Sequence, residues 1–313
     1  MKYRLLSSVL CGALLLLSAG VTAAEPTQKT ASEQKSAAKK KATRQAQKKS
    51  GRKKANEPQP TRTIDYKTVG DITLKLHVFE PKQHQAGDQR AAAVFFFGGG
   101  WVGGSPSQFF PHCQELADKG LWAASAEYRV KSRHGTTPYD CVADGKSAVR
   151  YIRSHARELG IDPNRIAAGG GSAGGHVASA TATVPGLDEA GEDTSTSCVP
   201  NALLLFNPVY DNGPDGWGHA KVKDRYREIS PMHNIRKGIP PAIVFLGTQD
   251  KLIPVETGKR FQQKMQAVGA ISELHLYEGE GHGFFNKGRG KSYPDTIQKM
   301  FAFLQKVKFI TAR

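Results

Sequence analysis

Residues 165–177 read Arg-Ile-Ala-Ala-Gly-Gly-Gly-Ser-Ala-Gly-Gly-His-Val. The first residues of this stretch are typical of the end of a buried strand, and a helix is expected from Gly174 onward. Residues 170–174 match the pattern G-x-S-x-G, which holds a serine on a sharp strand-to-helix turn. Flanking glycines let neighbouring backbone pass this strained turn without a Cβ clash. The pattern therefore predicts that Ser172 is a nucleophile and that the Ala173 N–H faces the developing negative charge.

Two other interpretations of these glycines are open. Gly169, Gly171 and Gly174 also match G-x-G-x-x-G, a dinucleotide-binding fingerprint. That fingerprint requires a second strand ending in an acidic residue about 20 positions later, whereas residues 184–200 have the composition of a loop. The other alternative is a glycine-rich turn without chemistry. The rest of the chain has to decide between them.

The first 24 residues are typical of a secretory signal peptide. Lys2 and Arg4 form a positive start, residues 5–17 are mainly apolar, and Val21-Thr-Ala23 resembles a cleavage site. The apolar core is shorter than the about 20 residues that span a bilayer. An uncleaved anchor is the alternative, but we expect an exported protein, periplasmic or secreted.

Residues 25–62 differ sharply in composition from the rest. They contain twelve Lys or Arg and three Glu, with no aromatic or large aliphatic residue, and so supply more than half of the formal net charge of +16. Such a segment buries too little apolar area to offset its ordering entropy, so we expect a disordered basic linker. It could bind an anionic surface or glycan, or act as a solvated spacer. Nucleic acid is not an expected partner, because no aromatic residue is present to stack on bases.

Cysteine usage adds little. Without Cys11, which lies in the apolar core of the signal peptide, the chain keeps Cys113, Cys141 and Cys198. One disulfide and one free thiol would suit an oxidising compartment, but the spacing does not indicate which pair would bond.

From residue 63 onward, strand-like and helix-like stretches alternate. The fully apolar run Ala92–Phe97 is typical of a strand that is buried on both faces of a sheet. Alternation of this kind predicts an α/β fold with a mostly parallel sheet of about eight strands and helices on both faces. The expected strands are 63–69, 71–79, 92–97, 121–128, 166–168, 202–206, 242–246 and 273–277. The expected helices are 107–119, 139–159, 174–182, 255–268 and 294–307.

Polar residues follow several of these strands. Asp250 follows the strand that ends at Leu246, and His282 follows the strand that ends at Tyr277. Ligands bind at the carboxyl ends of strands in such sheets, and Ser, Asp, His is the chain order of the catalytic triad in α/β-hydrolases. Taken singly, Asp250 could cap a helix and His282 could be a surface histidine. Their order and their positions at strand ends favour a triad with Ser172.

Several motifs together resemble the α/β-hydrolase carboxylesterases. The resemblance extends to hormone-sensitive-lipase-like esterases and, more closely, to bacterial esterases that remove acetyl or feruloyl groups from polysaccharides. The motifs are Phe97-Gly-Gly-Gly-Trp101, Glu127-Tyr-Arg-Val130, Gly170-Gly-Ser-Ala-Gly-Gly-His176, Ser230-Pro-Met232, Gly247-Thr-Gln-Asp-Lys-Leu-Ile-Pro254 and Gly281-His-Gly-Phe-Phe285. They cover roughly residues 62–310, so the expected parts are a signal peptide (1–24), a linker (25–62) and an α/β-hydrolase domain (63–313).

The resemblance implies an oxyanion hole made by the backbone N–H groups of Ala173, Gly99 and Gly100. Its first loop usually begins with histidine, and here Phe97 stands in that place, which leaves open how the loop is held. Residues 209–237 are long enough to form part of a cap. The aromatic candidates for substrate contact are Trp101, Tyr210 and Trp217, although packing against the sheet is equally compatible with the sequence.

The expected function is therefore hydrolysis of carboxylic esters of short acyl groups, acetyl or feruloyl, on carbohydrates or small alcohols, through Ser172, His282 and Asp250. Asp215 is the alternative acid. No cofactor is implied, and no metal-binding motif is present in the sequence. Amide or peptide hydrolysis, including formamidase chemistry, could use the same triad. A catalytically inactive glycan-binding fold is the alternative outside enzymes, and oligomeric state is not indicated.

Overall fold

The structure, a computed structural model, describes residues 57–310. The predicted signal peptide and most of the predicted linker lie outside these residues. The first strand begins at Arg62, one residue before the predicted start of the folded domain, and the backbone N–H of Thr61 donates to Val78 O at 2.7 Å. No helix in the described part of the chain is both long and apolar enough to cross a bilayer.

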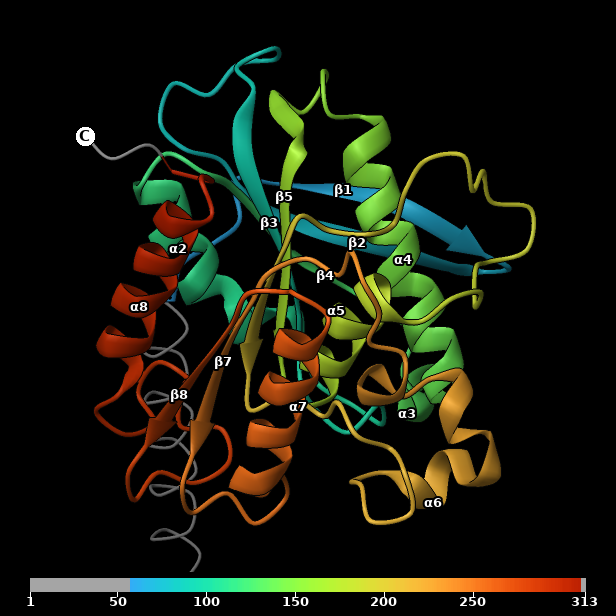
Figure 1. Cartoon of the computed structure of the whole chain (residues 1–313). Coiled ribbons are helices and arrows are strands. Elements are labelled where there is room, and N and C mark those ends of the chain that lie inside the picture. Colours follow the sequence, from blue (N-terminus) through green and yellow to red (C-terminus); the bar gives the residue numbers. More distant parts are fainter. Residues whose placement is uncertain (1–56, 311–313) are drawn as a thin grey trace, which may run out of the picture. The chain divides into compact units, whose positions relative to one another are not determined.

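Eight strands of the described chain form one sheet, in the order β1-β2-β4-β3-β5-β6-β7-β8 (Figure 1). Strand β2 pairs antiparallel with β1 and β4, and the pairs from β4–β3 to β7–β8 are parallel. The strands are β1 (Arg62–Val69), β2 (Ile72–Phe79), β3 (Arg90–Phe96), β4 (Trp122–Ala126), β5 (Ile161–Gly171), β6 (Ala202–Phe206), β7 (Ala242–Gly247) and β8 (Ser272–Tyr277). Because parallel strands end at a common edge, the loops after β3, β5, β7 and β8 meet there.

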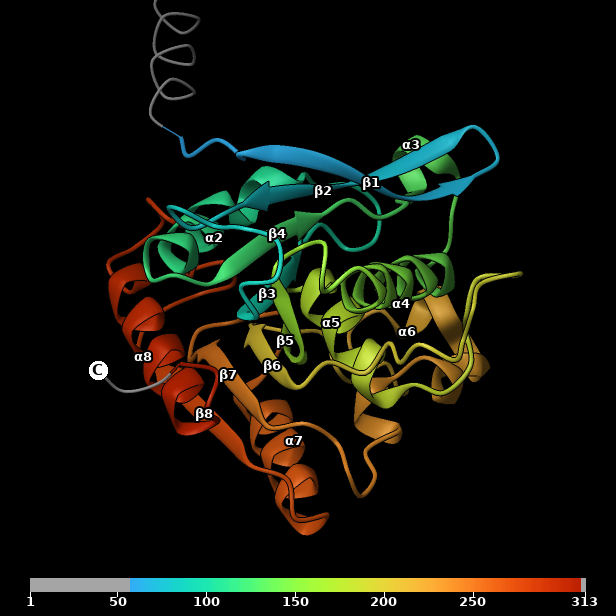
Figure 2. The same cartoon turned by 90° about the horizontal axis from the view of Figure 1, so that it is seen from above.

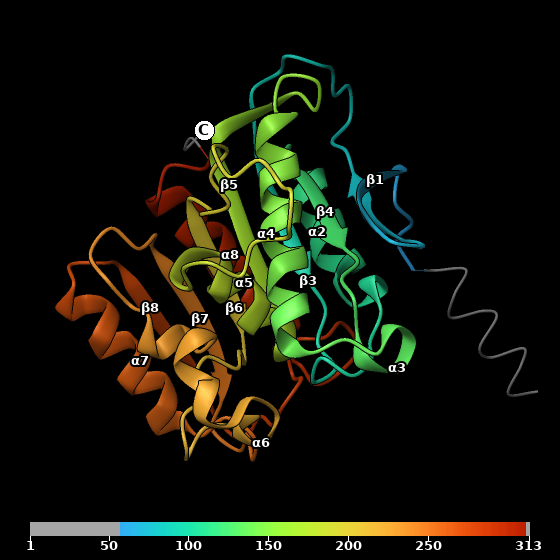
Figure 3. The same ribbon diagram turned by 90° about the vertical axis from the view of Figure 1, so that its right-hand side faces the viewer.

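Helices cover both faces of the sheet, as predicted (Figures 2 and 3). Along β3, Val94 packs into one apolar cluster with α4, α5 and α7, while its neighbour Phe95 packs into a second cluster with α2 and α8. This alternation follows from the period of two in a strand. The helices are α2 (Phe110–Asp118), α3 (Lys131–His134), α4 (Pro138–Ser154), α5 (Ala173–Thr183), α6 (His219–Val222), α7 (Val255–Ala267) and α8 (Tyr293–Lys306), with 3₁₀ turns at Pro106–Phe109, Lys223–Glu228 and Pro231–His233.

Two of the predicted helices differ in extent from the observed ones. The helix predicted over 107–119 is divided into a 3₁₀ turn and α2, because Pro111 has no N–H to continue the hydrogen-bond ladder. The helix predicted over 139–159 is α4, which ends at Ser154, before the turn at Gly160. The three cysteines of the described chain are buried free thiols, so the disulfide considered from the sequence is not formed.

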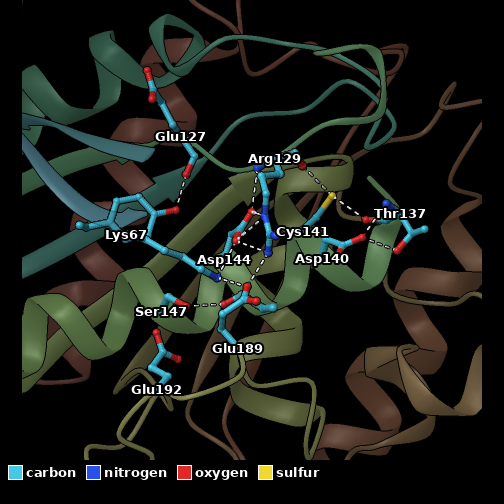
Figure 4. A network of polar contacts seen from close by, with 12 residues as sticks. Lys67, Glu127, Arg129, Thr137, Asp140, Cys141, Asp144, Ser147, Glu189 and Glu192 are labelled. Carbon is cyan, nitrogen blue, oxygen red and sulfur yellow. Dashed lines mark hydrogen bonds and ion pairs between the residues drawn. The ribbon is translucent and has the colours of Figure 1, made fainter. Parts of the chain in front are cut away.

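A buried charge network joins four separate segments (Figure 4). Asp144 of α4 is fully buried and accepts hydrogen bonds from Lys67 Nζ at 2.7 Å, from the backbone N–H of Arg129 at 2.8 Å and from the Arg129 guanidinium. Glu189, in the loop after α5, lies 2.6 Å from both Lys67 Nζ and Arg129 Nη2. Burial opposes ionisation of Glu189, but these two cations prevail and hold the pKa of its carboxyl below the usual value. The network therefore ties β1, the segment after β4, α4 and this loop together.

Replacing Asp144 by Asn should lower the free energy of unfolding by about 3–5 kcal/mol, because two buried cations lose their shared counter-charge. Urea denaturation followed by circular dichroism measures this loss. Asp65→Asn is the matched control, because it removes a carboxylate from the exposed Asp65–Lys75 pair and should leave the stability nearly unchanged. Equal losses in the two variants would show that burial of the network does not add to the free energy of unfolding.

Candidate active site

Ser172 lies at the turn between β5 and α5, with φ 55° and ψ −120°. Only glycine fits at positions 171 and 174, because a Cβ on Gly174 would lie 2.0 Å from Phe96 O and one on Gly171 would lie 2.3 Å from the Phe285 ring. The backbone of the turn therefore approaches β3 and the loop after β8 more closely than any side chain would allow. This is the strained strand-to-helix turn that the sequence predicts.

The structure brings Ser172, His282 and Asp250 together. The distance from Ser172 Oγ to His282 Nε2 is 2.9 Å, and that from His282 Nδ1 to Asp250 Oδ2 is 2.7 Å. The carboxylate of Asp250 is buried, and its other oxygen accepts the backbone N–H groups of Leu252 and Ile253. A carboxylate can only accept, so it favours the tautomer with the proton on Nδ1, which leaves Nε2 to accept from the serine hydroxyl.

The alternative acid, Asp215, is exposed in the segment before α6 and makes no contact with His282. The buried position of Asp250 thus distinguishes it from the other candidate that the sequence offered.

A further residue of the site, Asn207, was missed from the sequence. It follows β6 directly, is fully buried, and its Oδ1 accepts the N–H of Gly283 at 2.9 Å, while its Nδ2 lies 3.4 Å from His282 Nε2. Asn207 therefore holds the loop that carries His282. The signal that could have found it is the same one that indicated Asp250, a polar residue directly after a buried strand.

The orientation of the predicted oxyanion donors follows from the carbonyl groups that precede them. Ser172 O accepts the N–H groups of His176 and Val209, and Gly99 O accepts those of Val102 and Gly103. In a planar trans peptide, the next N–H points to the opposite side. The N–H groups of Ala173 and Gly100 therefore point in the opposite direction to the carbonyls of Ser172 and Gly99. Within residues 57–310, neither N–H donates a hydrogen bond to a protein acceptor.

The loop that carries Gly99 and Gly100 is braced without the usual histidine. Phe97 is buried and stacks on Tyr128 with ring centroids 4.2 Å apart, and Tyr128 Oη donates to Phe97 O at 2.6 Å. Burial raises the pKa of the Tyr128 phenol well above its usual value, so it stays a donor. Gln108 Oε1 accepts the N–H of Gly98 at 2.6 Å. A Cβ placed on Gly98 would lie 3.3 Å from Ser172 Cβ, so the braced loop lies beside the serine.

Two of the three side chains predicted to contact the substrate are buried in this structure. Tyr210 is fully buried and stacks on Phe261 with ring centroids 4.6 Å apart, and Trp101 is also buried, edge-on to His176. Both rings pack inside the protein and present no face to a ligand. Trp217 is half-buried and packs on Trp101, and its ring would lie 3.2 Å from a Cβ on Gly100. It remains a predicted substrate contact.

Removing the Tyr128 hydroxyl should abolish its hydrogen bond to Phe97 O and keep the stacking of the two rings. We expect Tyr128→Phe to lower kcat for ester hydrolysis by about tenfold, with little change in KM, because loosened oxyanion donors act mainly on the transition state. Steady-state kinetics measures this change. Tyr226→Phe, a half-buried tyrosine in the 3₁₀ turn after α6, is the control. An unchanged kcat in Tyr128→Phe would show that this hydrogen bond does not position the loop.

Comparisons with known proteins show similarity to esterases and hydrolases. A family model described as BD-FAE matches residues 76–202, and one for the dienelactone hydrolase family matches residues 223–308. Esterase LipC of Mycobacterium tuberculosis is 30% identical over 61% of this chain and 52% of its own length. An acetylxylan esterase of Xylanibacter ruminicola is 27% identical over 54% of this chain and 35% of its own length. The chain thus spans about half the length, or less, of these two relatives.

Among solved structures, esterase 2 of Thermogutta terrifontis phosphorylated by paraoxon has a TM-score of 0.77 and 44% identity, covering 80% of this chain and 96% of that one. The similarity therefore includes nearly the whole of a solved enzyme. The chain belongs to the carboxylesterases of the α/β-hydrolase fold.

Proposed function

We propose that this carboxylic ester hydrolase is an exported serine esterase that removes short acyl groups, acetyl or feruloyl, from carbohydrates or small alcohols. The observation that carries the mechanism is the hydrogen-bonded chain from Ser172 through His282 to Asp250. Export is supported by the N-terminal sequence alone. The carbohydrate assignment is supported by similarity to an acetylxylan esterase.

In the proposed reaction, Ser172 Oγ attacks the ester carbonyl while His282 Nε2 takes its proton. Asp250 holds the imidazole in the required tautomer and stabilises the imidazolium. The N–H groups of Ala173, Gly99 and Gly100 bind the oxyanion, and one such donor contributes roughly 3 kcal/mol in comparable sites. His282 then gives its proton to the departing alcohol, and water hydrolyses the acyl-enzyme by the same steps.

The surroundings of the serine support a small acyl group. Residues 209–237, the candidate cap, contain only α6 and two 3₁₀ turns. Trp217 from this segment lies close to Gly100, since a Cβ placed there would be 3.2 Å from the Trp217 ring. We therefore expect the ratio kcat/KM to fall as the acyl chain of p-nitrophenyl esters lengthens from acetate to decanoate.

Ser172→Ala should lower kcat on p-nitrophenyl acetate by roughly 10³-fold or more in a protein that remains folded. Paraoxon or a fluorophosphonate should label the wild type but not this variant, as detected by intact mass. Ser154→Ala, which removes an exposed hydroxyl at the end of α4, is the control and should be labelled normally. Unlabelled wild type without esterase activity would favour an inactive glycan-binding fold.

Asp250→Asn should lower kcat by about 10⁴-fold, because the amide favours the wrong histidine tautomer. The control is Asp215→Asn, which changes the exposed alternative acid and should retain full activity. The opposite result would move the role of acid from Asp250 to Asp215. Rates on acetanilides in the same assays separate ester from amide hydrolysis.

A further inference from the structure

Gly100, which carries one of the proposed oxyanion donors, is held by backbone on one side only. The carbonyl that precedes its N–H accepts the N–H groups of Val102 and Gly103. On the other side, Gly100 O accepts a hydrogen bond from Lys221 Nζ at 2.8 Å and, within residues 57–310, none from a backbone N–H. Lys221 is therefore the group that holds the second peptide of this glycine.

The backbone at Gly100 adopts a conformation that needs such support. Gly100 has φ 61° or more in common with its successor, because its own φ is 64° and that of Trp101 is 61°. Glycine adopts these angles easily but leaves them just as easily, whereas tryptophan adopts them only at a cost in energy. Two left-handed residues in succession keep this geometry only where their surroundings hold them.

The short helix α6, which carries Lys221, packs directly on Trp101. A Cβ placed on Gly218, the residue before α6, would lie 2.8 Å from the Trp101 ring. The backbone N–H of Lys221 donates to Gly218 O at 2.9 Å, so the lysine lies within one turn of this contact. Its Nζ would lie 3.7 Å from a Cβ on Gly100. The candidate cap thus reaches the loop of Gly100 through a side chain that its own packing positions.

The surroundings of Lys221 favour its charged form as the donor. Its Nζ lies 5.6 Å from the centroid of the Trp101 ring and 5.4 Å from that of the Trp217 ring. Aromatic rings attract a cation at such distances, and a hydrogen bond from an ammonium group is about twice as strong as one from a neutral donor. A neutral amine would lose both of these advantages.

We propose that Lys221 is a positioning residue for ester hydrolysis, whose ammonium group fixes the Gly100 carbonyl and thereby the direction of the Gly100 N–H. The inference rests on the proposed oxyanion donors and assigns part of their support to the candidate cap, residues 209–237. Lys221 acts through Gly100 and not on the reacting atoms. Its removal should therefore weaken binding of the transition state more than binding of the ester.

The charge of Lys221 gives this support a pH dependence. Partial burial, and then the like charge of Lys131, lower its pKa below the usual value for lysine. Cys141 also acts on Lys221, but burial raises the pKa of this thiol well above its usual value, so it stays neutral. The ammonium group is present at neutral pH and is lost as the pH rises through the lowered pKa. The support of Gly100 should therefore weaken on the alkaline side.

The test compares Lys221→Met, which removes the donor, with Lys221→Arg, which keeps a cationic donor. We expect kcat on p-nitrophenyl acetate to fall about tenfold in Lys221→Met near neutral pH, with KM changed by less than about twofold. Lys221→Arg should keep kcat within about threefold of the wild type. From about pH 7 to about pH 10, the ratio of wild-type kcat to Lys221→Arg kcat should fall several-fold, because arginine does not titrate in this range.

Lys223→Met is the matched control, because Lys223 is an exposed lysine of the same segment, in the 3₁₀ turn after α6. Its kcat and KM should equal those of the wild type. A kcat in Lys221→Met within about twofold of the wild type, or a loss confined to KM, would overturn the inference. So would a ratio of wild-type to Lys221→Arg kcat that stays constant with pH, a measurement that does not depend on the folding of Lys221→Met. Failure of the proposed function is distinct, because the wild type would then cleave the ester no faster than Ser172→Ala.

Discussion

The backbone around Ser172 packs against its neighbours more closely than a side chain would allow, and this packing positions the serine. Gly174 lies against the end of β3, and Gly171 lies against Phe285 in the loop after β8. Because these contacts leave no room for a Cβ, the turn joins the ends of two strands that are far apart in the chain. The same packing brings the serine hydroxyl into reach of His282. A strained turn is thus held by the packing of its neighbours, as expected for a functional site.

The orientation of the backbone donors and of the His282 ring is set mainly by groups that lie behind them in the protein. The carbonyls of Ser172 and Gly99 each accept two backbone N–H groups, and peptide planarity then sets the direction of the next donor. Asn207 and Asp250 fix the histidine loop and ring from two sides. A preorganised arrangement of this kind needs little rearrangement during the reaction, which is the main source of electrostatic stabilisation in enzymes.

The elements and the grouping of Ser172, Asp250 and His282 could be predicted from the sequence because their signals are local. A glycine-flanked serine, a carboxylate after a buried strand and a histidine after the last strand each lie within a few residues of a recognisable strand end. The burial of Tyr210 and Trp101 could not be predicted, since an aromatic ring has the same local pattern whether it packs inside or faces a ligand. The brace between Tyr128 and Phe97 depends on contact across the fold, and no short pattern encodes it.

The hydrogen bond from Lys221 Nζ to the Gly100 carbonyl links the segment before the Ser230-Pro-Met232 motif to the loop that carries Gly99 and Gly100. Two parts of the chain separated by more than a hundred residues therefore support each other through this hydrogen bond. During divergence within the family, a change of length or sequence in either part alters the support of the other. These two segments are expected to evolve together, and an engineer who exchanges one of them between relatives should transfer both.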